Sequence, residues 1–251
     1  MNILKNRPGR VLASVISTLI IYGVIWAVNS WGAGAEINRI VEMLGGRLPP
    51  GVIQAATFLL FVFGILEVFR LNSRITDEQA AYSLNLLPEK ENWVLSADDV
   101  NKLKLQVQDI ERSGKYYLTS LVRKCCTKYR LSRESSEALA LADSQIDIYR
   151  AEMESEQSFI RYTLWAIPSV GFIGTVWGIG ESLGLAHEAS SREGIKKITQ
   201  ALGVAFDTTL WALVLCIILM YAVHCFQKRV DDFFIGMKDY VIENLINRLY
   251  K

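Results

Sequence analysis

A few polar side chains lie inside long apolar stretches of this chain, and their types could handle an ion. Thr175 lies within the uncharged run from Tyr162 to Gly180, and Asp207, Thr208 and Thr209 stand near the start of another apolar segment. Oxygen atoms in such surroundings can replace part of the hydration shell of a passing ion. A hydroxyl can equally bond back to its own helix, so the threonines are weak evidence by themselves.

Asp207 is the most costly of these residues, because it lies inside an apolar segment at 198–226. A charge in the middle of a membrane helix costs about 2.5–3.5 kcal/mol on insertion scales. Such a residue normally faces a bundle interior, a partner or water. We expect a role in ion handling or partner contact, and a structural polar contact is the alternative.

Small residues line one face of each of the last two apolar segments, at helical steps of three and four. On the first segment they are Gly171, Gly174, Thr175, Gly178 and Ser182, and on the second Ala201, Ala205, Thr208 or Thr209, Ala212 and Cys216. Small residues allow close approach of helix backbones in lipid. The faces therefore predict either tight packing within one chain or the lining of a lumen shared by several copies.

Four segments are long enough to cross a hydrocarbon core of about 30 Å as helices, which takes roughly 20 residues. They are 11–32, 50–70, 161–185 and 198–226. The whole chain of 251 residues is 51% hydrophobic and 21% charged. The first segment follows a basic start, as a secretory signal does, but it exceeds the usual length of a signal's apolar region. We expect it to be retained, and a cleaved signal is the alternative.

Lysine and arginine are spread unevenly between these segments, which predicts the topology. Three lie in 1–10, fourteen in 70–161 and five in 227–251, whereas the two short hairpin loops share five. Because basic residues are retained on the cytoplasmic side, we expect both termini and the central segment to be cytoplasmic. The sequence thus predicts an all-α integral membrane protein. Its expected parts are a cytoplasmic N-terminus 1–10, a peripheral hairpin 11–70, a cytoplasmic helical domain 71–160, a pore-lining hairpin 161–226 and a cytoplasmic amphipathic helix 227–251.

Helices are expected throughout the cytoplasmic parts. Ser96 precedes a first turn with two acidic residues, which is typical of a helix start, and Gly114 interrupts the pattern that follows. A second helix spans about 115–130, and a third begins at Ser132 or Ser135 and can run straight into the membrane at 161. The amphipathic continuation of the last segment predicts core packing, with a partner-binding or membrane-surface helix as the alternative.

Several classes of function find no support in these residues. Only two histidines occur, on opposite expected sides of the membrane, and no phosphate-binding P-loop appears. Neither long basic runs nor zinc-ligand spacings that would indicate nucleic-acid binding are present. The four cysteines form no framework of the secreted or metal-binding type. We therefore expect neither an enzyme nor a cofactor, and no nucleic acid as a direct partner.

Two motifs resemble the MotA/TolQ/ExbB proton-channel family. The segment 168–179, PSVGFIGTVWGI, is similar to that family's P-x-x-G-x-x-G-T-V-x-G signature, which follows a large cytoplasmic segment. The segment 202–213, LGVAFDTTLWAL, is similar to the signature A-L-x-x-T-x-x-G-L in the family's last helix. The order and spacing of the motifs also agree, and four spans match the MotA-like branch.

The resemblance implies a bacterial inner-membrane motor subunit that conducts protons, or possibly sodium. It implies a homopentamer around a dimer of a single-span MotB/ExbD/TolR-like partner, whose membrane helix carries an essential aspartate. The lumen-lining threonines of the family correspond to Thr175 and Thr209, with Thr208 and Asp207 beside them, and Pro168 corresponds to a kink near the pore. The neighbouring Gly171, Gly174, Gly178, Ala205 and Ala212 would pack the helices.

The sequence also departs from the family pattern. Asp207 and Trp211 stand where many members have apolar or small residues, and Ala212 replaces the usual glycine. We find no rotor-binding charge pair in 70–160, so a flagellar role is not favoured. The alternatives are a non-conducting scaffold subunit of an envelope complex and a small-solute transporter. The transporter would require an inverted repeat or broken helices, and only Pro168 points that way.

Overall fold

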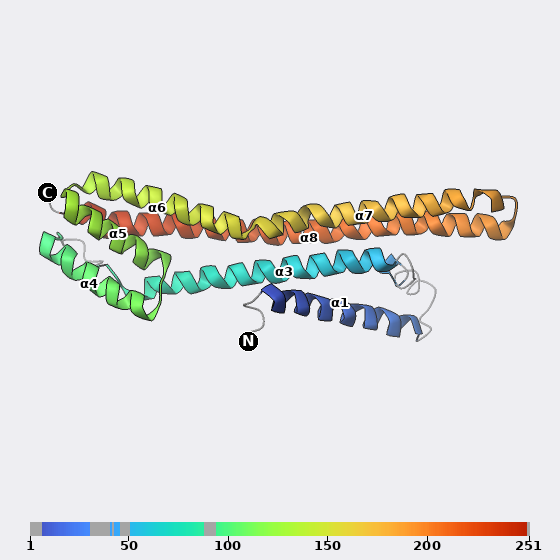
Figure 1. The fold of residues 1–251 in the computed structure, drawn as a ribbon, viewed down its shortest axis with the longest axis horizontal. Helices are drawn as coiled ribbons and strands as arrows, with labels where there is room; N and C mark the ends of the chain where they lie inside the picture. The colour runs from blue at the N-terminus through green and yellow to red at the C-terminus, as the bar shows by residue number, and fades with distance from the viewer. Residues whose placement is uncertain (1–6, 31–40, 42, 46–50, 88–93, 250–251) are drawn as a thin grey trace. The chain divides into compact units, whose positions relative to one another are not determined.

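The computed structural model describes residues 7–30, 41, 43–45, 51–87 and 94–249, and the regular elements among them are helices (Figure 1). The first six residues of the expected N-terminal segment and most of the first hairpin loop lie outside the described residues. The chain divides into two compact units, one from residues 1–70 and 158–224 and the other from 71–157 and 225–251.

Four helical stretches are long and apolar enough to cross a membrane. They are Pro8–Ile25, Gly51–Leu84, Ser135–Gly184 and Arg192–Arg248. This confirms the predicted class, a multi-pass helical membrane protein.

The first unit contains α1 (Arg7–Ser30), α7 (Ser158–Gly184) and large parts of α3 (Gly51–Gln79) and α8 (Arg192–Asn244). A Cβ added at Gly64 of α3 would lie 2.8 Å from the Leu219 side chain of α8 and 3.3 Å from Thr163 of α7. The absence of a side chain at Gly64 therefore lets α3 pack closely on the α7–α8 pair.

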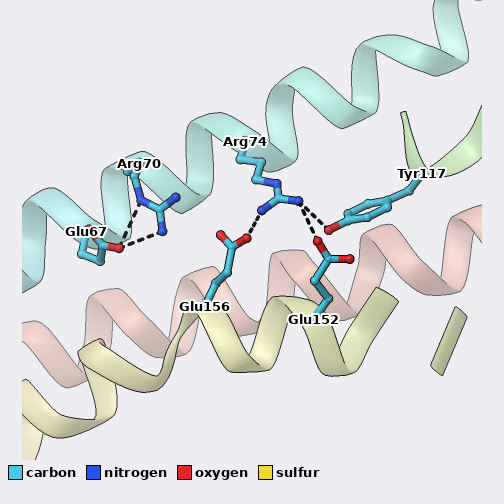
Figure 2. A network of polar contacts seen from close by, with 6 residues as sticks. All are labelled: Glu67, Arg70, Arg74, Tyr117, Glu152 and Glu156. Atoms are coloured by element: carbon cyan, nitrogen blue, oxygen red, sulfur yellow. Dashed lines mark hydrogen bonds and ion pairs between the residues drawn. The ribbon is translucent and has the colours of Figure 1, made fainter. Parts of the chain in front are cut away.

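A buried ion pair joins α1 to α3. Arg10 Nε lies 2.7 Å from Glu67 Oε2, and both side chains are 2% exposed. Glu67 also accepts hydrogen bonds from Arg70, the shorter at 2.7 Å (Figure 2). Glu67 lies near the end of the second expected span, and its side chain is buried against α1. Removing one partner of such a pair costs about 3–5 kcal/mol.

The second unit contains α4 (Ala97–Ser113), α5 (Tyr117–Ser132) and α6 (Ser135–Glu156). The predicted start at Ser96 is confirmed, because its side chain accepts from the backbone of Asp99 and the Asp99 carboxylate accepts from Ser96 in return. Gly114 follows the last residue of α4, as predicted. The hydrogen bonds from Ser96 hold the pKa of Asp99 below its usual value.

Three helices extend beyond the expected membrane spans. The second expected span ends at 70, but α3 continues to Gln79. The third cytoplasmic helix runs on into the membrane segment as predicted, because Gln157, between the end of α6 at Glu156 and the start of α7 at Ser158, keeps a helical backbone and its N–H bonds to Met153 O at 3.2 Å. The long expected continuation of the last span is confirmed, since α8 is one helix of 53 residues.

The extra length of α3 carries Arg74, which binds two other helices of the second unit. Arg74 bonds to Glu156 and, at 3.5 Å, to Glu152 on α6, and it donates to the Tyr117 hydroxyl of α5 at 2.7 Å (Figure 2). Glu78 accepts from the Tyr117 backbone N–H at 2.7 Å. Burial raises the pKa of the Tyr117 hydroxyl, although the nearby Arg74 charge lowers it. These contacts fix the start of α5 and the end of α6 on α3.

Candidate functional site: the threonine cluster between α7 and α8

Glycines on α7 let the backbone of α8 approach closely. A Cβ added at Gly171 would lie 2.4 Å from the Ala212 Cβ, and one added at Gly174 would lie 2.4 Å from Thr208 Oγ1. A Cβ added at Gly178 would lie 2.8 Å from a backbone oxygen of α8. Each distance is shorter than two non-bonded heavy atoms allow, so α7 requires glycine at these three positions.

The two small faces expected from the sequence therefore lie against one another within a single chain. Their buried members are Gly171, Gly174, Gly178 and Ser182 on α7, and Ala201, Ala205, Thr208, Ala212 and Cys216 on α8. Of the two interpretations that the sequence leaves open, this geometry favours packing for the glycines and alanines.

The expected pore threonines come together at the centre of this seam. The hydroxyls of Thr175 on α7 and Thr209 on α8 form a hydrogen bond with each other. Each also reaches a backbone carbonyl of the opposite helix: Thr175 Oγ1 lies 3.2 Å from Ala205 O, and Thr209 Oγ1 lies 3.1 Å from Gly171 O. Both residues are half-buried, so they lie at the edge of the seam.

Thr208 is placed differently from the other two threonines. Its side chain is 2% exposed, and its hydroxyl donates to Ala205 O at 2.9 Å within α8. The same oxygen lies 3.5 Å from Gly171 O across the seam. Thr208 thus belongs to the hydroxyl cluster but is covered within the chain, and its expected place in the ion pathway stays a prediction.

Asp207 lies on another side of α8. It stands five positions before Ala212, which contacts α7, so it is about 140° around the helix from the seam. Its side chain is 7% exposed. Asp207 is therefore next to Thr208 in the sequence, but it lies on a different side of α8 from the threonine cluster. Its role in ion handling or partner contact stays a prediction.

Apolar side chains project from both helices outside the seam. The exposed ones at this level are Phe172, Ile173, Val176 and Trp177 on α7, and Phe206, Leu210, Leu213, Val214 and Ile217 on α8. In a membrane these faces contact lipid or another protein chain. Thr175 and Thr209, which are half-buried, lie at the edge of the seam beside these faces.

Pro168 lies inside α7, and its effect on the backbone is compensated by a residue whose role the sequence does not reveal. Proline has no N–H, so Pro168 cannot bond to Leu164 O, the carbonyl four residues earlier. The Cys216 thiol of α8 reaches that same oxygen, with Sγ 3.4 Å away. In the sequence, Cys216 stands out only as a small residue on one face of its span. The missing proline N–H is a local signal, but the identity of its replacement depends on how the two helices align.

The chemistry available at this cluster is that of neutral hydroxyl and carbonyl oxygens. Such atoms can accept hydrogen bonds from a hydrated proton or coordinate a small cation. Among the residues that the structure describes, no group of three or more His, Cys, Asp or Glu could hold a metal ion.

A comparison with protein-family models supports the resemblance drawn from the two motifs. Residues 116–238 match the model described as the MotA/TolQ/ExbB proton channel family. The match covers α5, α6, α7 and most of α8, including the threonine cluster. Neither a search of curated proteins nor one of solved structures finds a match.

Proposed function

We propose that this chain, which belongs to the MotA/TolQ/ExbB proton channel family through residues 116–238, is the channel-forming subunit of an ion-driven membrane motor. The motor would convert an ion gradient into rotation or other mechanical work for a downstream process. A membrane potential supplies about 2.3 kcal/mol per charge per 100 mV.

One observation carries the proposal. The two residues that correspond to the family's pore threonines, Thr175 and Thr209, meet through their hydroxyls at the edge of the α7–α8 seam. They come from different helices and lie far apart in the sequence. Packing alone would be served by apolar side chains, whereas paired hydroxyls provide oxygen atoms for an ion inside an otherwise apolar region.

The assembly follows from the family. Five copies would surround a dimer of a single-span MotB/ExbD/TolR-like partner, and ions would cross beside that partner's membrane aspartate. The ion would be a proton, with sodium as the alternative. The location would be a bacterial inner membrane, with both termini in the cytoplasm.

Ion flux tests the proposal. The chain is co-expressed with candidate single-span partners, and the complex is reconstituted in liposomes with a pH-sensitive dye or, in parallel, a sodium-sensitive dye. Thr175→Val and Thr209→Val keep the shape of the side chain and remove the oxygen. Because a hydrogen bond to a charged group is worth about 1.5–3 kcal/mol, we expect flux to fall about 10- to 100-fold.

Thr199→Val is the matched control, since Thr199 is an exposed threonine of α8 whose hydroxyl bonds to its own helix at Ile195 O, 3.0 Å away. That variant should conduct normally. Normal conduction by both Thr175→Val and Thr209→Val would remove the assignment of the ion pathway. Native mass spectrometry of the same complex should give five copies of this chain with two of the partner.

A non-conducting scaffold subunit is the second candidate, and a specific observation favours it. The hydroxyls of Thr175, Thr208 and Thr209 are all satisfied by one another or by the carbonyls of Gly171 and Ala205 within the chain. These hydrogen bonds within the chain are enough for a scaffold, which has no ion to bind. It predicts that the threonine variants weaken the α7–α8 hairpin but leave the function of the complex intact.

A further inference from the structure

Three hydroxyls compete for few acceptors at the seam. Each threonine supplies one O–H donor and two acceptor lone pairs. The carbonyls within reach belong to Ala205 and Gly171. Each already accepts an N–H in its own helix, from the residue four positions later, so each has one lone pair left for a hydroxyl.

The distances decide which hydroxyl takes which carbonyl. Ala205 O is 2.9 Å from the hydroxyl of Thr208, 3.2 Å from that of Thr175 and 3.5 Å from that of Thr209. Thr208 therefore makes the shortest bond to this oxygen. Gly171 O is nearer to Thr209, at 3.1 Å, than to Thr208, at 3.5 Å.

The arrangement with the shortest bonds satisfies all three donors without using any lone pair twice. Thr208 donates to Ala205 O, Thr209 donates to Gly171 O, and Thr175 donates to Thr209. The hydroxyl pair then has a single direction, and both lone pairs of Thr175 are left to accept from a group outside the seam.

The α7 backbone holds the Thr208 side chain in place. A Cβ added at Gly174 would lie 2.4 Å from Thr208 Oγ1, 2.6 Å from its Cβ and 2.9 Å from its Cγ2. Thr208 thus packs directly on the α7 backbone at Gly174, and this contact restricts its rotation. The side chain is also 2% exposed, so water does not compete for its hydroxyl.

We infer that Thr208 is a positioning residue of the ion pathway. By occupying Ala205 O, it makes Thr175 donate to Thr209, so that the oxygen atoms of Thr175 stay available to an ion. This inference rests on the proposed function of Thr175 and Thr209 and adds to it a third residue, which itself lines no path.

Loss of the Thr208 hydroxyl frees Ala205 O. The Thr175 hydroxyl can then turn to that carbonyl, 3.2 Å away, and Thr209 can donate to Thr175 in place of Gly171 O. The hydrogen bond between the Thr175 and Thr209 hydroxyls could then run in either direction, with similar free energies. The acceptor geometry presented to an ion would then be correct in only part of the population.

The test compares four substitutions in the reconstituted complex of this chain and its partner. Thr208→Val removes the hydroxyl and keeps the shape, whereas Thr208→Ser keeps the hydroxyl and removes a methyl group. Thr175→Val and Thr209→Val report on the pathway itself. We expect Thr208→Val to lower flux about two- to tenfold, the range of one net hydrogen bond, and Thr208→Ser to conduct like the unmodified chain.

The outcomes separate this inference from the function on which it rests. Normal flux in Thr208→Val, together with loss in Thr175→Val and Thr209→Val, overturns the role of Thr208 and leaves the pathway standing. Equal losses in Thr208→Val and Thr208→Ser also overturn it, because they indicate a packing defect. Normal flux in all four variants refutes both the assigned ion pathway and the role of Thr208. If Thr208→Val does not assemble, Thr208→Ala replaces it, with the same expected loss and the same rescue by serine.

Discussion

The pairing of Pro168 with Cys216 gives a sharp test of how the α7–α8 seam is stabilised. Pro168 leaves Leu164 O without its helical N–H, and the Cys216 thiol bonds to that oxygen, with Sγ 3.4 Å from it. Cys216 is 6% exposed, so the thiol is not replaced by water without rearrangement. We predict that Cys216→Ala destabilises the protein because it leaves a carbonyl unsatisfied in an apolar region.

The magnitude follows from two terms. A net hydrogen bond contributes about 0.5–1.5 kcal/mol, and an unsatisfied buried polar group costs about 1–3 kcal/mol. Measured bonds between membrane helices average about 0.6 kcal/mol, and a thiol is a weak donor. We therefore expect Cys216→Ala to lower the free energy of unfolding by about 1 kcal/mol.

A double-mutant cycle isolates this bond from general packing. Pro168→Ala restores an N–H four residues after Leu164, and that N–H can bond to Leu164 O without help from α8. In the Pro168→Ala background, the thiol becomes unnecessary and Cys216→Ala should cost only its small packing term. The expected coupling energy is about 0.5–1 kcal/mol. Cys216→Ser keeps a donor at this position and serves as the control.

Reversible unfolding in mixed micelles, followed by tryptophan fluorescence, measures the four free energies. If Cys216→Ala costs the same with proline and with alanine at 168, the thiol does not replace the missing N–H and the reasoning is refuted. A cost in Cys216→Ser as large as that in Cys216→Ala would point to the same conclusion.

Two further predictions follow from the geometry of the helices. Gly174→Ala should destabilise the α7–α8 hairpin by about 1–3 kcal/mol, because its Cβ would lie 2.4 Å from Thr208 Oγ1. Gly180→Ala is the control and should be nearly neutral, since nothing lies within 4 Å of the corresponding Cβ. Equal effects of the two substitutions in the same unfolding assay would contradict this prediction. Burial raises the pKa of Cys125 and of Cys126 to about 12. Because the folded state then retains protons that the unfolded state loses near pH 8.5, stability should decline as the pH rises from about 8.5 towards 12. Alkylation at pH 8 should accordingly spare Cys125 and Cys126 in the folded protein and modify both after unfolding, and rapid modification of both in the folded protein would be the contrary result.

Much of the helical framework can be read from local patterns. Uncharged runs indicate the membrane helices because the bilayer core excludes charge along a fixed length. The start of α4 at Ser96 and its end before Gly114 follow from residues that satisfy or terminate the backbone within one turn. Local pattern does not locate the far end of α3, where contacts of Arg74 within the second unit help to hold the chain helical to Gln79.

In the candidate site, too, some features follow from the local sequence pattern and others depend on tertiary contacts. The sequence alone determined that glycines, alanines and threonines form small faces on the last two spans, because their spacing repeats with the helical period. Only the tertiary structure decided that these faces meet within one chain, that Thr175 pairs with Thr209, and that Thr208 is covered. It also decided that Glu67 pairs with Arg10 across two helices. The physical reason is that helical period follows from backbone geometry, whereas the vertical alignment of two helices depends on all of their side chains at once.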